Sequence, residues 1–364
     1  MTFLQTNTKI WLIPFTLGVI LFTVGYYVNN FIKPDYHYDS QSYYENFLAE
    51  GIKIKTLKIV NVKTKSDSRH YKINVLQHAL LPGIGNCNCN CTVPNRTQKV
   101  PKILHYVYLN EDPNYLPFNF IHWLAFTSSI ETIKPEKTYF HYIHEPKSYW
   151  YQLIKPKLSI MKTRIVTEIF GNPVNVIQHK SDIIRMEVLR DFGGIYLDND
   201  IIVLQPFDDL LYNDFTMGIE DTWGQGLCDA VIISRPFAPF LTRWIQNYKD
   251  FNDHHWNYHS VQLPYQMSQE YVNDIQVLNK TAFFWPTWMD EHLDLAFNST
   301  NYNFSNNYAY HMWSSASYGK YLKYMSPKSI KSEETSFNRA VRKFLNYLPK
   351  DFNEETFDID GKNN

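Results

Sequence analysis

The chain has no excess of charge of either sign. Its 35 Lys and Arg residues are balanced by 36 Asp and Glu residues, which gives a formal net charge of −1. A chain without a broad basic field has little with which to hold the phosphates of a nucleic acid. It also has no long block of like charges that could act as an electrostatic tail. We therefore expect no nucleic-acid partner.

Cysteine is scarce, with four residues among 364. Cys87, Cys89 and Cys91 alternate with asparagine, and Cys228 makes the number even, so disulfides are allowed in an oxidising compartment but no pairing is specified. The spacing is not the Cys-x-x-Cys of a structural zinc site. A buried thiol is the alternative for Cys228.

Long apolar runs are also few, and the one at residues 10–28 has 19 residues without a charge. At about 1.5 Å per residue a helix of this length spans roughly 28 Å, enough for the core of a bilayer. A cleaved signal peptide is the alternative, but its apolar region is normally only about 7–15 residues long. We interpret residues 1–28 as a cytosolic tail and signal anchor, because Lys9 precedes the run while Lys33 and Asp35 follow it.

This topology predicts a single-pass type II membrane protein whose remaining residues are lumenal, in the Golgi or endoplasmic reticulum. Five Asn-x-Ser/Thr sequons agree with a lumenal location. They begin at Asn90, Asn95, Asn279, Asn298 and Asn303. We interpret residues 29–99 as a lumenal stem, because they mix Tyr, Asn and Lys with short alternating segments and end in the cysteine cluster.

The rest of the chain is rich in core-forming residues. Hydrophobic residues make up 44% of the sequence and aromatic residues 16%, which suffices for one sizeable core. Short apolar segments that alternate with helical ones predict an α/β domain with a mostly parallel sheet at residues 100–325. The expected strands are residues 103–109, 138–143, 174–178, 195–197, 215–219 and 230–233. Residues 326–364 are expected to form a helix, capped by Ser336, and a polar tail.

Residues 180–204 contain the most informative pattern. Ser181 can cap a helix over residues 182–192, and Gly193 can end it in the left-handed conformation. The strand that follows meets Asp198-Asn199-Asp200 before a second apolar run. Ionised carboxylates among apolar neighbours are costly unless a cation or strong donor lies beside them, and two hard oxygen ligands suit Mg²⁺ or Mn²⁺. A hairpin turn built from the same residues is the alternative.

Two segments of this pattern resemble the glycosyltransferases that carry a DXD sugar-binding region. They are Ser181-Asp182-x-x-Arg185 and Gly193-Gly194-Ile195-Tyr196-Leu197-Asp198-x-Asp200. Residues 101–108, 258–264 and 310–313 are similar to further, less specific blocks of the family. The resemblance implies the GT-A type of nucleotide-sugar-binding fold, a nucleotide-diphosphate sugar donor, Mn²⁺ or Mg²⁺, and a glycan, glycolipid or glycoprotein acceptor. It also implies retention of the anomeric configuration.

The resemblance further implies roles for individual residues. Asp198 and Asp200 are expected to bind the metal, with His311 as a candidate third ligand whose alternative is a structural histidine. Asp182 and Arg185 are expected to contact the donor sugar, and a plain helix-start salt bridge is their alternative. Tyr108, Tyr196 and Trp313 are expected to make further contacts with the donor. For Tyr108 the alternative is a purely structural position in the core.

The sequence differs from the family pattern at two places, and it leaves three functional hypotheses. Asp229 stands where many relatives carry asparagine, and Asn110-Glu111 replaces a glycine pair. The favoured hypothesis is an active hexosyltransferase that uses a UDP-hexose, with UDP-galactose, UDP-N-acetylglucosamine and GDP-mannose all allowed. The others are a catalytically inactive relative that binds nucleotide sugar or glycan, and a phosphohydrolase with a strand-end Asp-x-Asp. No carboxylate can be chosen as a nucleophile from the sequence.

Overall fold

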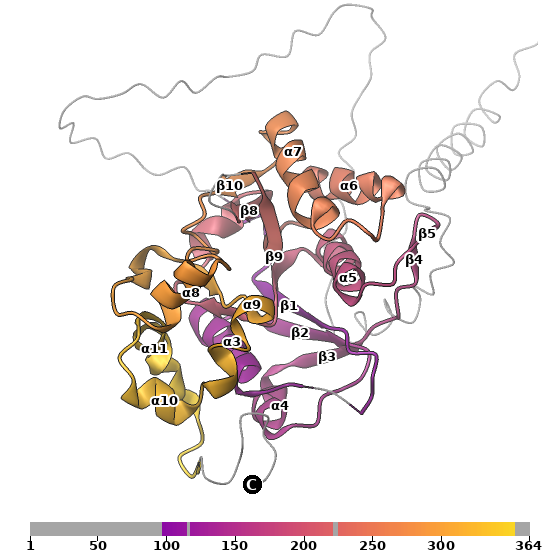
Figure 1. The fold of residues 1–364 in the computed structure, drawn as a ribbon. Helices are drawn as coiled ribbons and strands as arrows, with labels where there is room; N and C mark the ends of the chain where they lie inside the picture. Colours follow the sequence, from indigo (N-terminus) through magenta and orange to yellow (C-terminus); the bar gives the residue numbers. More distant parts are fainter. Residues whose placement is uncertain (1–96, 115–116, 221–224, 354–364) are drawn as a thin grey trace, which may run out of the picture. The chain divides into compact units, whose positions relative to one another are not determined.

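The computed structural model describes residues 97–114, 117–220 and 225–353 (Figure 1). The signal anchor predicted at residues 10–28, most of the stem and the clustered cysteines lie outside the described residues. Within the part of the chain that the structure describes, no helix is both long and apolar enough to cross a membrane. Cys228 is buried with a free thiol.

The central feature is a seven-stranded sheet in the order β10-β8-β9-β6-β1-β2-β3. Its strands are β1 (Ile103–Tyr108), β2 (Lys137–Tyr142), β3 (Ser159–Lys162), β6 (Gly194–Leu197), β8 (Phe215–Ile219), β9 (Leu227–Ser234) and β10 (Gln276–Leu278). In this sheet β9 pairs antiparallel with both β6 and β8, and every other pairing is parallel. The predicted α/β class with a mostly parallel sheet is therefore confirmed.

Helices cover both faces of the sheet. Helix α3 (Phe120–Ile133) connects β1 to β2, and helix α5 (Ile177–Phe192) leads from the β3 side back to β6 on the other side of β1. Because these two crossovers move in opposite directions along the sheet, the right-handed rule places their helices on opposite faces. Tyr106 of β1 stacks on Phe126 of α3, and the β1 residues Leu104 to Tyr108 are all buried. Burial on both faces explains the continuous apolar run of this strand.

Helix α5 begins earlier than predicted. Its N-cap is Val176, which makes no side-chain capping bond, so Ser181 lies within the helix and does not cap it. The strand predicted at residues 174–178 is wrong for the same reason. The preceding short strands β4 (Glu168–Ile169) and β5 (Asn172–Pro173) pair with each other instead. The missing cap is replaced by the distant carboxylate of Asp253, which accepts from the backbone N–H groups of Asn175 and Val176 at 3.0 and 3.4 Å.

The predicted end of α5 is confirmed at Phe192, and a glycine pair makes the turn into β6. Gly193 and Gly194 have φ of +65° and +108°. Gly193 has a ψ of −166°, so the predicted left-handed helical conformation is wrong although φ is positive. A Cβ atom on Gly194 would lie 2.8 Å from the carbonyl oxygen of Ile103. Close packing of the turn against β1 therefore requires glycine.

The strand after the Asp-Asn-Asp turn leaves the main sheet. Strand β7 (Ile201–Val203) pairs antiparallel with β11 (Ala309–His311), and Ile201 lies opposite His311. The other α-helices of the described residues are α4 (Tyr149–Ile154), α6 (Pro239–Gln246), α7 (Leu263–Glu270), α8 (Asp290–Phe297), α9 (Ser314–Ser317), α10 (Pro327–Ser332) and α11 (Ser336–Val341) (Figure 1). Thr335 caps α11, one residue before the predicted cap. Phe337 of α11 packs on Phe297 of α8, which joins the C-terminal helices to the core.

Candidate active site

The Asp-Asn-Asp turn lies at the carboxyl end of β6 and is fixed on three sides. The N–H of Asp198 donates to the carbonyl oxygen of Ala230 in β9 at 2.9 Å. The side-chain amide of Asn199 donates to the carbonyl oxygen of Val107 in β1 at 2.9 Å. The carbonyl oxygen of Asp200 accepts from the N–H of Met312 at 3.0 Å. The two carboxylates are therefore held at the edge where parallel sheets bind phosphate-bearing ligands.

The structure brings Asp198, Asp200 and His311 together. One ligand atom from each of the three residues can be chosen so that all lie within 4.8 Å of one another. His311 reaches this position because β11 pairs with β7 directly after the turn. Its Nε2 lies 3.1 Å from Oδ1 of Asp200, whose Oδ2 accepts from the N–H of Ser314 at 2.9 Å.

Asp200 and His311 each favour the charged form of the other. Burial disfavours the ionised form of Asp200, but the nearby His311 and the hydrogen bonds from His311 and Ser314 outweigh it and lower the pKa of Asp200. Burial likewise opposes protonation of His311, while the Asp200 carboxylate prevails and raises the pKa of His311. Two carboxylates and an imidazole are ligands that Mn²⁺ accepts, so the residues fit a divalent cation.

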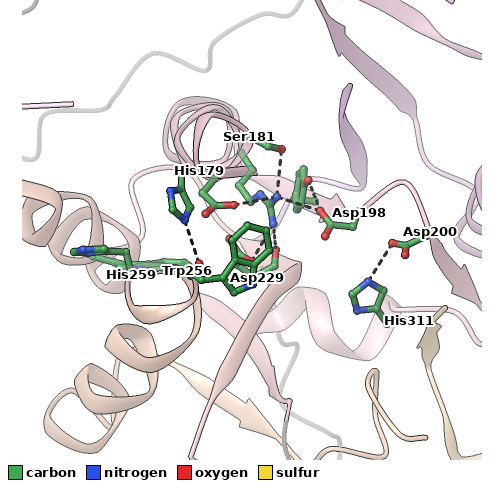
Figure 2. Close-up of polar contacts among 12 residues, drawn as sticks. His179, Ser181, Asp198, Asp200, Asp229, Trp256, His259 and His311 are labelled. Carbon is green, nitrogen blue, oxygen red and sulfur yellow. Dashed lines mark hydrogen bonds and ion pairs between the residues drawn. The ribbon is translucent and has the colours of Figure 1, made fainter. Parts of the chain in front are cut away.

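A second cluster surrounds Arg185. Its buried guanidinium forms ion pairs with Asp182 at 3.1 Å, Asp198 at 3.2 Å and Asp229 at 3.0 Å (Figure 2). It also lies 4.5 Å from the ring centre of Tyr196, whose hydroxyl donates to Asp198 at 2.5 Å. Because α5 begins at Ile177, the Asp182–Arg185 ion pair lies inside the helix and not at its start, and the contact of these residues with a donor sugar stays a prediction. Arg185 links α5 and β9 to the Asp-Asn-Asp turn.

The Arg185 cluster contains more acid than base. Three carboxylates face one guanidinium, and Asp182 and Asp229 are only 5% and 6% exposed. Burial, and the negative charges of the neighbouring carboxylates, raise the pKa of both Asp182 and Asp229 despite the opposing effect of Arg185. These two side chains therefore retain a proton between them more readily than exposed carboxyls do. The sequence marked Asp229 only as a departure from the family pattern.

The remaining predicted residues lie in different surroundings. Trp313 stands beside His311 with ring centres 4.0 Å apart, and its indole N–H donates to the carbonyl oxygen of Pro286 at 3.0 Å. Tyr108 is only 6% exposed and packs on Phe140 with ring centres 5.6 Å apart. The structure thus places Tyr108 within the aromatic core. Its contact with a donor base stays a prediction, as do the donor contacts of Tyr196 and Trp313.

Fold and sequence together define a class. Residues 95–216 match the family described as "Glycosyltransferase sugar-binding region containing DXD motif". The chain is also 39% identical over 272 residues to glucan organizing enzyme 1 of Cryptococcus neoformans, with 71% of this chain and 73% of that protein covered. The chain therefore belongs to the glycosyltransferases with a DXD sugar-binding region, and it is an enzyme of the glycosyltransferase class.

Two further comparisons are more distant. The mannosyl phosphorylinositol ceramide synthase SUR1 of Saccharomyces cerevisiae is 27% identical over 167 residues, which cover 46% of this chain and 39% of that protein. Among solved structures, the apo form of the glycosyltransferase GlyE of Streptococcus pneumoniae is similar with a TM-score of 0.40 and 12% identity. That similarity covers 68% of this chain and 60% of GlyE.

Proposed function

We propose that this enzyme transfers a hexose from a nucleotide-diphosphate sugar, with a UDP-hexose favoured, to a hydroxyl group of a glycan, glycolipid or glycoprotein. The observation that carries the proposal is the convergence of Asp198, Asp200 and His311 at the carboxyl edge of a mostly parallel sheet. This arrangement also supports the GT-A type of fold. Retention of the anomeric configuration is part of the proposal and is supported by the family resemblance alone.

Asp198, Asp200 and His311 would hold the cation, Mn²⁺ or Mg²⁺. A divalent cation in this position supplies positive charge against the diphosphate that leaves during transfer. The protein keeps these ligands in place before the donor arrives, because Ser314 holds Asp200 while Tyr196 and Arg185 hold Asp198. Such fixed polar groups need little reorganisation during the reaction.

Arg185 and Asp182 would form the side of the site that contacts the donor sugar. Both side chains are buried, and their ion pair is held by Asp229 from the neighbouring strand. A guanidinium fixed by three carboxylates cannot turn freely, so its position relative to Asp198 is set by the fold. This geometry supports a role in orienting the donor sugar against the diphosphate.

We further propose a type II membrane protein of the Golgi or endoplasmic reticulum with a lumenal catalytic domain. The apolar run at residues 10–28 supports this topology. Three sequon asparagines that the structure describes are exposed, as glycan attachment requires, namely Asn279, Asn298 and Asn303. The names of two relatives, glucan organizing enzyme 1 and mannosyl phosphorylinositol ceramide synthase, also agree with a glycosylation pathway.

A donor screen tests the proposal. Full-length protein in detergent is incubated with Mn²⁺ and UDP-galactose, UDP-N-acetylglucosamine, UDP-glucose or GDP-mannose, and release of the nucleoside diphosphate is measured. We expect release from one donor, most readily from a UDP-hexose. GDP-mannose is the competing donor because the Saccharomyces cerevisiae relative is named a mannosyl phosphorylinositol ceramide synthase. Donor binding without release, with Mn²⁺ present, would instead show the inactive sugar-binding relative.

A further inference from the structure

A loop at residues 251–257 is fastened to the first turn of α5 by polar contacts. The carboxylate of Asp253 lies 2.8 Å from Nδ1 of His179 and accepts from the backbone and side-chain N–H groups of Asn175. Nε2 of the same His179 lies 3.1 Å from the carbonyl oxygen of Trp256 (Figure 2). The buried His179 side chain thus contacts both Asp253 and Trp256 and connects the loop to the helix.

The loop presents a large aromatic ring on this fixed backbone. The indole of Trp256 is 63% exposed, although one of its neighbours is the His179 ring at a centroid distance of 6.0 Å. His254 and His255 beside it are exposed as well. An exposed tryptophan on a mobile loop needs no explanation, but one whose backbone is held by a buried histidine and a capping carboxylate is pre-positioned for contact.

Trp256 lies at the same edge of the sheet as the Asp-Asn-Asp turn. The C-terminal end of α5 leads directly into the start of β6. The N-terminal end of α5 therefore lies toward the carboxyl ends of the parallel strands. His179 precedes Asp182 by three residues, which is about 4.5 Å along a helix axis. Figure 2 shows Trp256 beside His179, with Asp200 and His311 at the opposite end of the group. The loop therefore borders the side of the site that contains Asp182 and Arg185, away from Asp200 and His311.

We propose that Trp256 forms a subsite for the acceptor saccharide, an assignment that rests on the proposed function. A pyranose ring has an apolar C–H face that can pack on an indole, while its hydroxyl groups stay available to polar neighbours and to the reaction. The position fits an acceptor because Asp200 and His311, two of the candidate ligands for the cation, lie at the other end of the group of residues from His179 and Trp256 (Figure 2). An acceptor that rests on Trp256 would lie on the Asp182–Arg185 side of the site, where the donor sugar is proposed to bind.

The kinetic test compares two exposed aromatic residues at opposite ends of α5. Phe237 is 62% exposed, and its N–H donates to the carbonyl oxygen of Arg190 near the C-terminal end of the helix. In full-length enzyme, Trp256→Ala should raise the KM for the acceptor by about tenfold and leave the KM for the donor unchanged. Trp256→Phe should lie between the parent and Trp256→Ala, and Phe237→Ala should match the parent.

An equal rise in both KM values for Trp256→Ala, or no rise in either, would overturn the proposal. A binding test separates this failure from a failure of the proposed function. The parent and Trp256→Ala are titrated, without donor, with mannose-terminated and galactose-terminated oligosaccharides. Weaker binding by the variant supports the subsite even if no donor is turned over. Equal binding, or no binding of any oligosaccharide by the parent, counts against the subsite even if the parent is an active transferase.

Discussion

Replacing Arg185 by methionine should strongly destabilise the protein, because the change leaves buried carboxylates without their cation. Asp182 and Asp229 are 5% and 6% exposed and both contact the guanidinium, which is itself 5% exposed. Removing one partner from a buried ion pair costs about 3–5 kcal/mol. We expect a loss of this size in the free energy of unfolding at pH 7.

The loss should be smaller at pH 5 than at pH 7. Without Arg185 the folded-state pKa values of Asp182 and Asp229 rise still further above those of the unfolded chain. A carboxyl with a raised folded-state pKa favours the folded state at low pH, and that contribution is lost as the pH rises through the folded-state pKa. For the same reason, adding Asp229→Asn to Arg185→Met should restore part of the stability, since one fewer buried carboxyl remains.

Urea unfolding followed by tryptophan fluorescence measures these differences. Arg243→Met is the matched control, because its ion pair with Asp274 is partly exposed and such pairs contribute about 0.2–1 kcal/mol. A loss for Arg185→Met no larger than that of the control would refute the description of the cluster as buried and coupled. If Arg185→Met combined with Asp229→Asn is less stable than Arg185→Met alone, the explanation that the cluster holds an excess of buried carboxylates is refuted.

Three further predictions concern other parts of the chain. Gly194→Ala should lower the free energy of unfolding by more than about 1 kcal/mol and reduce activity, because a Cβ there meets the carbonyl oxygen of Ile103; unchanged urea unfolding would contradict this. Burial lowers the pKa of His105 to about 4, so its contribution to stability should be lost as the pH falls from about 6.5 to 4, and His105→Asn should flatten that part of the urea-midpoint profile. Alkaline extraction should leave the full-length protein in membranes with endoglycosidase-sensitive glycans, whereas a soluble chain that begins near Asn29 would show a cleaved signal peptide.

Much of the sheet could be predicted because its strands carry their own local signal. Strands β1, β2, β6, β8 and β9 are short buried runs of apolar and aromatic residues, and each was placed within a few residues. Strand β3 (Ser159–Lys162) was missed because it lies at the edge of the sheet and only Met161 of its residues is buried. The start of α5 was missed because Asp253 supplies its cap from 78 residues away.

The candidate site was predictable where the residues lie within one motif. Asp198 and Asp200 follow the last residue of β6, Leu197, by one and three residues, and the family resemblance supplied Asp182 and Arg185. The contact of Asp229 with Arg185 could not be read from the sequence, because it depends on the antiparallel pairing of β9 with β6. His311 was proposed by resemblance, and no local pattern indicates the β7–β11 pairing that brings it to Asp200.

The central claim is that Asp200 holds a cation against the leaving diphosphate. Asn in place of Asp200 keeps an oxygen that can accept from the N–H of Ser314 but removes the anionic ligand. The measurement is release of nucleoside diphosphate from the preferred donor as Mn²⁺ is titrated into chelator-treated enzyme. We predict that chelation abolishes release by the parent, that Mn²⁺ restores it, and that Asp200→Asn reduces turnover by ~10²-fold or more with its circular dichroism unchanged. Parental turnover by Asp200→Asn, or full activity of the parent in excess chelator, would contradict the account.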